Sequence, residues 1–152
     1  MNAEGGARPE HHCAVGDSRQ LGAGIATRWI DTLTPERRLH FSPIPIPGAH
    51  ILKPERMEDS RGYFARTWCQ AEFAREGIDV KIVQASVSQN ALAGTLRGLH
   101  FSWWPSQEGK LVRCERGRVF DVILDLRPTS PAFLSHFAVI LDDKQGDALF
   151  IP

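Results

Sequence analysis

The sequence lacks an excess of charge of either sign. Its 152 residues carry 18 lysines and arginines against 18 aspartates and glutamates, so the formal net charge is zero. Domains that bind nucleic acids usually have a basic excess. We therefore expect no nucleic-acid partner.

Long apolar runs are absent as well. No stretch approaches the ~18 consecutive apolar residues from which a transmembrane helix is recognised. The N-terminal residues also lack the apolar segment of a secretory signal. We therefore expect no membrane association.

Cysteine is scarce and scattered. The chain has three cysteines, Cys13, Cys69 and Cys114, and none of them forms a Cys-x-x-Cys pair. Such a set is typical of reduced thiols in a cytoplasmic protein and speaks against a zinc site. Cytoplasmic localisation is the expectation.

The composition changes near residue 40. Residues 1–40 are rich in Gly, Ala, Arg and His in their first part and show no sustained periodicity, which predicts a mobile extension. Residues 41–152 are long enough for one domain with a core of its own. The sequence thus predicts an extension followed by a single ordered domain.

The ordered part consists of many short strand-like segments separated by Gly-containing turns. This pattern indicates an all-β sandwich or barrel. We expect a turn at 59–62, one short helix at 70–76, and strands at 49–52, 63–68, 82–89, 95–101, 110–115, 119–126, 133–141 and from 149 onward.

Charged side chains are unusually dense in three of these strand-like segments, around His100, Lys110 and Asp121. Polar groups that face a core must be paired or solvated. A cluster of basic and acidic groups in the mouth of a β-barrel suits an anionic ligand and proton transfer. These segments are the first candidates for a functional site.

Several segments between residues 43 and 152 resemble the dTDP-4-dehydrorhamnose 3,5-epimerase family in order and spacing. They are Arg61-Gly62-Tyr63-Phe64, Val83-Gln84-Ala85-Ser86-Val87-Ser88, Gly94-Thr95-Leu96-Arg97-Gly98-Leu99-His100, Lys110-Leu111-Val112-Arg113-Cys114, Gly117-Arg118-Val119-Phe120-Asp121-Val122, Asp125-Leu126-Arg127-Pro128-Thr129-Ser130-Pro131 and Leu149-Phe150-Ile151-Pro152. The resemblance implies a cupin-like double-stranded β-helix, or jelly roll. It also implies a homodimer that exchanges N-terminal strands and an enzyme without a cofactor.

The family continues beyond the segment that matches Ile151-Pro152. Its further residues include a second histidine, a tyrosine taken as the catalytic acid and an aspartate that supports the catalytic histidine. The resemblance therefore implies a jelly roll that is incomplete at its C-terminus. We expect catalysis by the chain as written to be impaired.

Epimerisation next to a ketone needs a base that removes a C–H proton and a group that stabilises the enolate oxygen. The resemblance assigns His100 as the base, which suits an imidazole that titrates near neutrality. Lys110 suits the cation beside the enolate, and we expect Val112 and Cys114 on the same strand face to point inward. The resemblance implies that Asp121 is a carboxylate that pairs with a histidine or arginine. The alternatives are a core histidine bonded to backbone, a solvated lysine and a structural ion pair.

Substrate-binding residues follow from the same resemblance. Arg61 and Arg97 match diphosphate-binding arginines, whose guanidinium forks fit phosphate oxygens. Gln84 matches a position that contacts the nucleotide. Surface charge for Arg61 and a structural amide for Gln84 are the alternatives.

A metal site is not expected, because Ser102 stands where the His-x-His pattern of metal-binding cupins would need a second histidine after His100.

The function that the resemblance implies is a cofactor-free epimerase that inverts C3, C5 or both in a dTDP-4-keto-6-deoxyhexose, in rhamnose-type deoxysugar biosynthesis. The alternatives are a non-catalytic jelly-roll module that binds the nucleotide sugar and a related 3,4-ketoisomerase.

Overall fold

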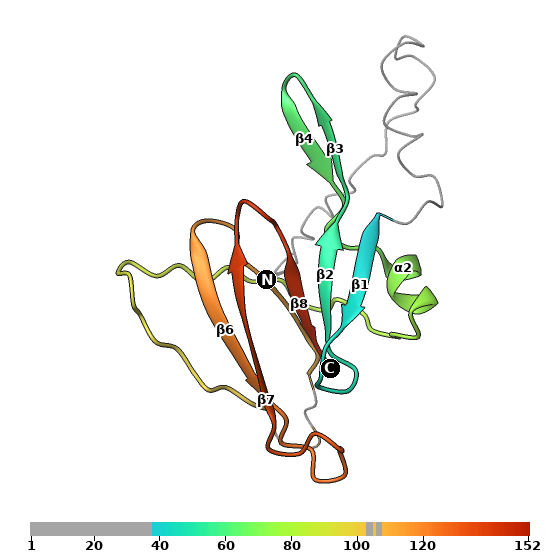
Figure 1. The fold of residues 1–152 in the computed structure, drawn as a ribbon, viewed down its shortest axis with the longest axis vertical. Coiled ribbons are helices and arrows are strands. Elements are labelled where there is room, and N and C mark those ends of the chain that lie inside the picture. The colour runs from blue at the N-terminus through green and yellow to red at the C-terminus, as the bar shows by residue number, and fades with distance from the viewer. Residues whose placement is uncertain (1–37, 103–104, 106–107) are drawn as a thin grey trace, which may run out of the picture. The chain divides into compact units, whose positions relative to one another are not determined.

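Short antiparallel strands dominate the computed structural model, which describes residues 38–102, 105 and 108–152 (Figure 1). The predicted extension over 1–40 therefore lies outside the described residues, apart from its last three. The strands are β1 (Leu39–Pro43), β2 (His50–Pro54), β3 (Arg56–Asp59), β4 (Gly62–Ala65), β5 (Lys110–Arg113), β6 (Arg118–Leu124), β7 (His136–Asp142) and β8 (Ala148–Ile151), with the helix α2 (Gln70–Arg75) after β4.

The strands form three antiparallel groups. A four-stranded sheet has the order β1-β2-β8-β5, and two-stranded sheets are formed by β3 with β4 and by β6 with β7. The register brings Leu52 opposite Ala148 and Val112 opposite Leu149. Because side chains alternate between the faces of a strand, this register gives the four-stranded sheet two apolar faces.

Each face of the four-stranded sheet is covered by its own core cluster. On one face, Leu149 and Val112 pack with Ile123 and Leu141, which come from β6 and β7. On the other face, Leu52 and its neighbours pack with α2. The β6–β7 sheet and α2 therefore lie on opposite sides of the same sheet.

The helix α2 begins and ends where the sequence predicts. Gly77 follows it with φ +74°, the left-handed conformation that favours glycine after a helix. Phe73 is fully buried, and its ring contacts Phe41, Trp68 and Phe150 with centroid distances of 4.1–5.7 Å. The helix is thus held to the sheet by one aromatic cluster.

Glu72 in the same helix is also buried, and its carboxylate is well satisfied. It accepts hydrogen bonds from the backbone of Arg38 (3.1 Å) and Leu39 (2.8 Å) and from Nη1 of Arg66 (2.6 Å). Burial is the largest single influence on Glu72 and raises its pKa. Together, however, these contacts outweigh burial, so the pKa of Glu72 is lowered. The carboxylate therefore fixes α2 to the start of β1.

The predicted strands at 82–89 and 95–101 are wrong. Residues 78–91 and 95–102 have no strand assignment, and the segment runs between α2 and β5 without an arrow in Figure 1. Val83 and Leu96 are 90% and 91% exposed. Their apolar side chains bury nothing, so no hydrophobic gain offsets the entropy of ordering the segment.

The other expected elements form, with shifted limits. The segment expected from residue 133 becomes a strand only at His136, because the preceding residues form turns that carry hydrogen bonds such as Leu134 N–H to Asp125 O (2.8 Å). The prediction of an all-β fold is confirmed. Within the described ranges, no helix is long and apolar enough to cross a bilayer.

Candidate functional site

Lys110 and Asp121 lie on facing surfaces of two sheets. Lys110 is the first residue of β5 and pairs with Ile151, on the face whose apolar residues join the core shared with β6 and β7. Asp121 in β6 lies opposite Val139 and shares a strand face with Ile123, which belongs to that core. Each of the two residues therefore lies on the face of its strand that is turned toward this shared core.

Asp121 is partly buried, and one oxygen of its carboxylate lacks a hydrogen-bond partner among the described residues. This oxygen, Oδ2, is itself buried. Burial raises the pKa of Asp121, and a hydrogen bond from the backbone of Val122 only partly offsets it. A buried oxygen without a partner is costly, which marks this position as a candidate for function.

Lys110 is more open to solvent. Its side chain is 42% exposed, and its Nζ lies 4.0 Å from the carboxylate of Glu108. Val112 and Cys114, two and four residues further on, pack into the core as the sequence predicts. The ammonium group of Lys110 lies at the start of β5, on the strand face that carries Val112 and Cys114. An ammonium group can stabilise an oxyanion that forms beside it.

His100, Gln84 and Arg97 lie in the segment without strands. All of them are exposed. Arg97 donates from Nε to Oδ1 of Asn90 (2.6 Å) and from Nη2 to the carbonyl of Gln89 (3.3 Å). Gln84 donates to Oγ of Ser86 (3.2 Å). These contacts are local and do not lead into the core.

Arg61 lies at the tip of the β3–β4 hairpin. Its side chain is 78% exposed and forms an ion pair with Asp59, with Nη2 and Oδ2 2.6 Å apart. The predicted turn over residues 59–62 is confirmed. Asp59 is a partner that the sequence analysis missed, although the Asp-x-Arg spacing in a turn is a signal for it.

The candidate residues do not form one connected cluster. Among the described residues, we find no hydrogen bond or ion pair that joins any two of them. Their contacts are instead to Asp59, Ser86, Asn90, Gln89, Glu108 and the backbone of Val122. The expectation that three consecutive strands carry the charged groups is wrong for the first, because the residues around His100 form no strand. It is confirmed for the segments of Lys110 and Asp121.

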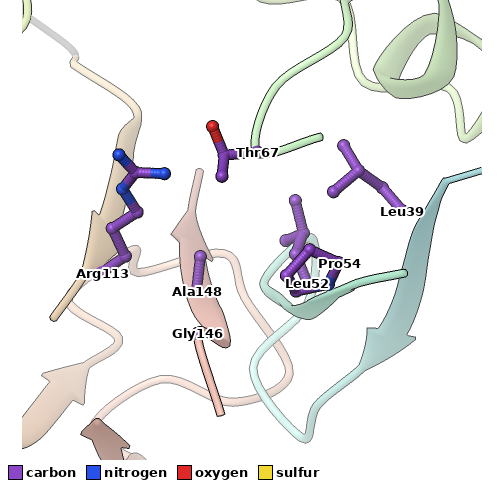
Figure 2. Close-up of a pocket in the computed structure, with 7 residues that line it drawn as sticks. All are labelled: Leu39, Leu52, Pro54, Thr67, Arg113, Gly146 and Ala148. Carbon is purple, nitrogen blue, oxygen red and sulfur yellow. The ribbon is translucent and has the colours of Figure 1, made fainter. Parts of the chain in front are cut away.

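Two cavities among the described residues are lined by neither Lys110 nor Asp121. A cavity of about 10 Å³ lies between Leu39, Leu52, Ala148 and Arg113 (Figure 2), and it can hold one water at most. A groove of about 410 Å³ borders the β3–β4 hairpin and is lined in part by Tyr63. None of the candidate residues lines either of them.

Residues able to hold a metal are not grouped. Within the described part of the chain, no three or more His, Cys, Asp or Glu side chains come together as possible ligands. Lys110 and Asp121 supply an ammonium and a carboxyl group, which suit acid–base work on an anionic intermediate.

Strands in open antiparallel sheets, packed around a shared core with polar groups between the sheets, define an all-β protein of the jelly-roll class. The family model described as dTDP-4-dehydrorhamnose 3,5-epimerase matches residues 43–152. The chain belongs to this family.

Three relatives illustrate the likeness. The dTDP-4-dehydrorhamnose 3,5-epimerase of Methanothermobacter thermautotrophicus is 42% identical over 112 residues, which are 74% of this chain and 60% of that protein. The Bacillus anthracis enzyme, solved with TDP and PPi bound, has a TM-score of 0.72 at 33% identity, covering 75% of this chain and 65% of that one. The Legionella pneumophila dTDP-6-deoxy-D-glucose-3,5-epimerase, in complex with dTDP-4-keto-L-rhamnose, has a TM-score of 0.68 at 32% identity, covering 75% and 60%.

The structural likeness confirms the cupin-like jelly roll. The chain spans about 60% of the length of the curated relative from Methanothermobacter.

Proposed function

We propose that this chain carries part of the active site of a nucleotide-sugar epimerase that acts on a dTDP-4-keto-6-deoxyhexose in rhamnose-type deoxysugar biosynthesis. The observation that carries the proposal is the pair Lys110 and Asp121, on facing surfaces of a fold that belongs to an epimerase family. Ligands named for two solved relatives, TDP and dTDP-4-keto-L-rhamnose, support the substrate class.

In the proposed mechanism, the imidazole of His100 removes the proton from C3 or C5, next to the C4 ketone. The C–H electron pair becomes the C=C bond of an enolate, and the Lys110 ammonium stabilises the negative oxygen. Asp121 accepts a hydrogen bond from a histidine or arginine of the site through Oδ2, which has no partner in the described residues. Return of a proton to the opposite face of the carbon completes the inversion.

Binding of the nucleotide diphosphate is assigned to Arg61 and Arg97, with Gln84 at the nucleotide. We further propose that the protein works in the cytoplasm as a homodimer and without a cofactor or metal. The exposure of Gln84, Arg97 and His100 is compatible with a segment that docks when substrate or a second subunit is present.

The same exposure favours a second candidate function, a nucleotide-sugar-binding module without catalysis. In this alternative, His100 remains in solvent and never reaches the space between Lys110 and Asp121. The module would bind dTDP and would exchange no substrate protons.

Solvent deuterium incorporation separates these functions. The chain is incubated with a dTDP-4-keto-6-deoxyhexose in deuterated water, and proton NMR follows the signals at C3 and C5. Incorporation that falls by about 10²–10³-fold in Lys110→Ala, but not in the surface control Lys144→Ala, would support the epimerase. Movement of the keto group would indicate a 3,4-ketoisomerase, and dTDP binding without incorporation would indicate the module.

A further inference from the structure

The tip of the β3–β4 hairpin is a turn stabilised by Asp59. Its Oδ1 accepts a hydrogen bond from the backbone N–H of Arg61 at 2.8 Å. Gly62 follows with φ +133°, a conformation that other residues rarely adopt. The turn therefore fixes the backbone from which the Arg61 side chain leaves the hairpin.

The same carboxylate also holds the guanidinium of Arg61. Nε lies 3.4 Å from Oδ1 and 3.2 Å from Oδ2, and Nη2 lies 2.6 Å from Oδ2. These contacts use the side of the guanidinium that carries Nε. Since the group has five N–H donors in a planar fork, the outer edge formed by Nη1 and Nη2 still has donors that point away from Asp59.

The base of the hairpin is tied down separately. The guanidinium of Arg56 lies over the ring of Tyr63, 4.3 Å from its centroid, and donates a hydrogen bond to the carbonyl of Lys144 in the β7–β8 turn. The base of the hairpin thus contacts the β7–β8 turn through Arg56, and its tip carries Arg61, which Asp59 holds.

We propose that Asp59 is a positioning residue that presents the outer edge of Arg61 to the diphosphate of a nucleotide sugar. The inference rests on the proposed function, in which Arg61 binds phosphate. An unrestrained arginine loses much rotamer freedom when it binds a ligand, and prior orientation removes that cost before the ligand arrives.

The negative charge of Asp59 acts in the opposite direction, because it repels phosphate. This repulsion is screened over about 8 Å at physiological ionic strength and is offset by the adjacent Arg61. Glu58 lies in the same hairpin and pairs with Tyr63 across the strands. Glu58→Gln therefore removes the same charge and leaves the contact between Asp59 and Arg61 in place.

The test compares Asp59→Asn with Glu58→Gln and Arg61→Ala. Asparagine keeps an oxygen for the backbone N–H of Arg61 and loses the bidentate hold on the guanidinium. We expect the Kd for dTDP at 0.15 M salt, measured by calorimetry, to rise about three- to fivefold in Asp59→Asn relative to Glu58→Gln, the range of an exposed ion pair. The rise for Arg61→Ala should be larger.

A second measurement needs no ligand. The 15N relaxation of Nε in Arg61 should show restricted motion in the wild-type chain and in Glu58→Gln, and faster motion in Asp59→Asn. Equal mobility in all three would overturn the inference, as would equal Kd values for Asp59→Asn and Glu58→Gln when Arg61→Ala weakens binding. An Arg61→Ala variant with unchanged Kd would instead remove the phosphate role of Arg61 itself, and the inference with it.

Discussion

Two parts of the chain have similar residue patterns and different structures. They are the sheet framework, which consists of β1, β2 and β5–β8, and the segment between α2 and β5. Both contain alternating apolar and polar residues, yet Leu149 in β8 is fully buried and Leu96 is 91% exposed. Residues 78–102 contain no strand, so no strand ladder pairs their backbone groups as the ladders of β2, β5 and β8 do. An alternating pattern therefore makes a strand only where a neighbouring strand pairs its backbone groups and a second layer covers its apolar face.

The largest expected effect tests this contrast with one substitution at two places. Leu149→Ala should lower the free energy of unfolding by about 2–5 kcal/mol, because it leaves a cavity between two sheets. Leu96→Ala should change it by less than about 0.5 kcal/mol. Denaturant unfolding measures both, and a cost above about 1 kcal/mol for Leu96→Ala would mean that the segment packs.

The buried carboxylate of Asp125 allows the polar contacts of the sheet framework to be tested. Its carboxylate accepts hydrogen bonds from Nε (2.8 Å) and Nη2 (2.7 Å) of Arg127 and from Oγ of Ser130 (2.6 Å). Nη2 of Arg127 also donates to the carbonyl of Pro47 (2.9 Å) in the β1–β2 connection. This group of contacts links the turns that follow β6 to the edge of the four-stranded sheet.

Asp125→Ala should lower the free energy of unfolding by about 2–3 kcal/mol, below the usual cost of breaking a buried ion pair because Arg127 is half-exposed. The hydrogen bonds of Arg127 hold the pKa of Asp125 well below its usual range. Its contribution is thus present above the unfolded pKa of about 3.9 and is lost as the pH falls toward the folded value. The control Asp79→Ala, at an exposed position, should change the free energy of unfolding at pH 7 by less than about 0.5 kcal/mol.

Much of the framework could be predicted from the sequence. The short strands, the helix at 70–76 and the turn at residues 59–62 follow from local patterns that the final structure also satisfies. The strands expected at 82–89 and 95–101 failed because strand formation depends on a partner, which local patterns do not reveal. β3 was missed because the charged residues of Arg56-Met57-Glu58-Asp59 give no apolar alternation.

At the candidate site, too, some features could be predicted from local patterns and others could not. Residue types and the family resemblance predicted that Lys110 and Asp121 lie in strands, and both strands form. The alternation around Val112 indicated which face of the strand is covered. The ion pair of Arg61 with Asp59 and the solvent-exposed position of His100 depend on side-chain placement and on strand pairing. Neither is encoded in the spacing of motifs.

A smaller effect of opposite sign is expected at Asp121. Burial raises its pKa, so its contribution to stability is complete below the unfolded pKa of about 3.9 and is lost as the pH rises through the folded value. Asp121→Asn should therefore raise the free energy of unfolding by roughly 0.5–1 kcal/mol at pH 7. Gains of this size are typical when a residue that destabilises the folded protein for the sake of function is replaced. The gain should vanish near pH 3.

Asp79→Asn, on the exposed surface, provides the matched comparison for Asp121→Asn and should change the free energy of unfolding at pH 7 by less than about 0.5 kcal/mol. A loss of stability in Asp121→Asn at pH 7 would mean that the carboxylate has a stabilising partner in solution. That outcome would contradict the unpaired Oδ2 described here.

Amide hydrogen exchange tests the contrast between framework and segment most directly. The account predicts strong protection for amides in β2, β5 and β8, and exchange close to that of an unfolded peptide for residues 79–102, which include Gln84, Arg97 and His100. Protection of the amides at 82–89 and 95–101 equal to that of the framework would contradict it, because it would show that these residues form paired strands.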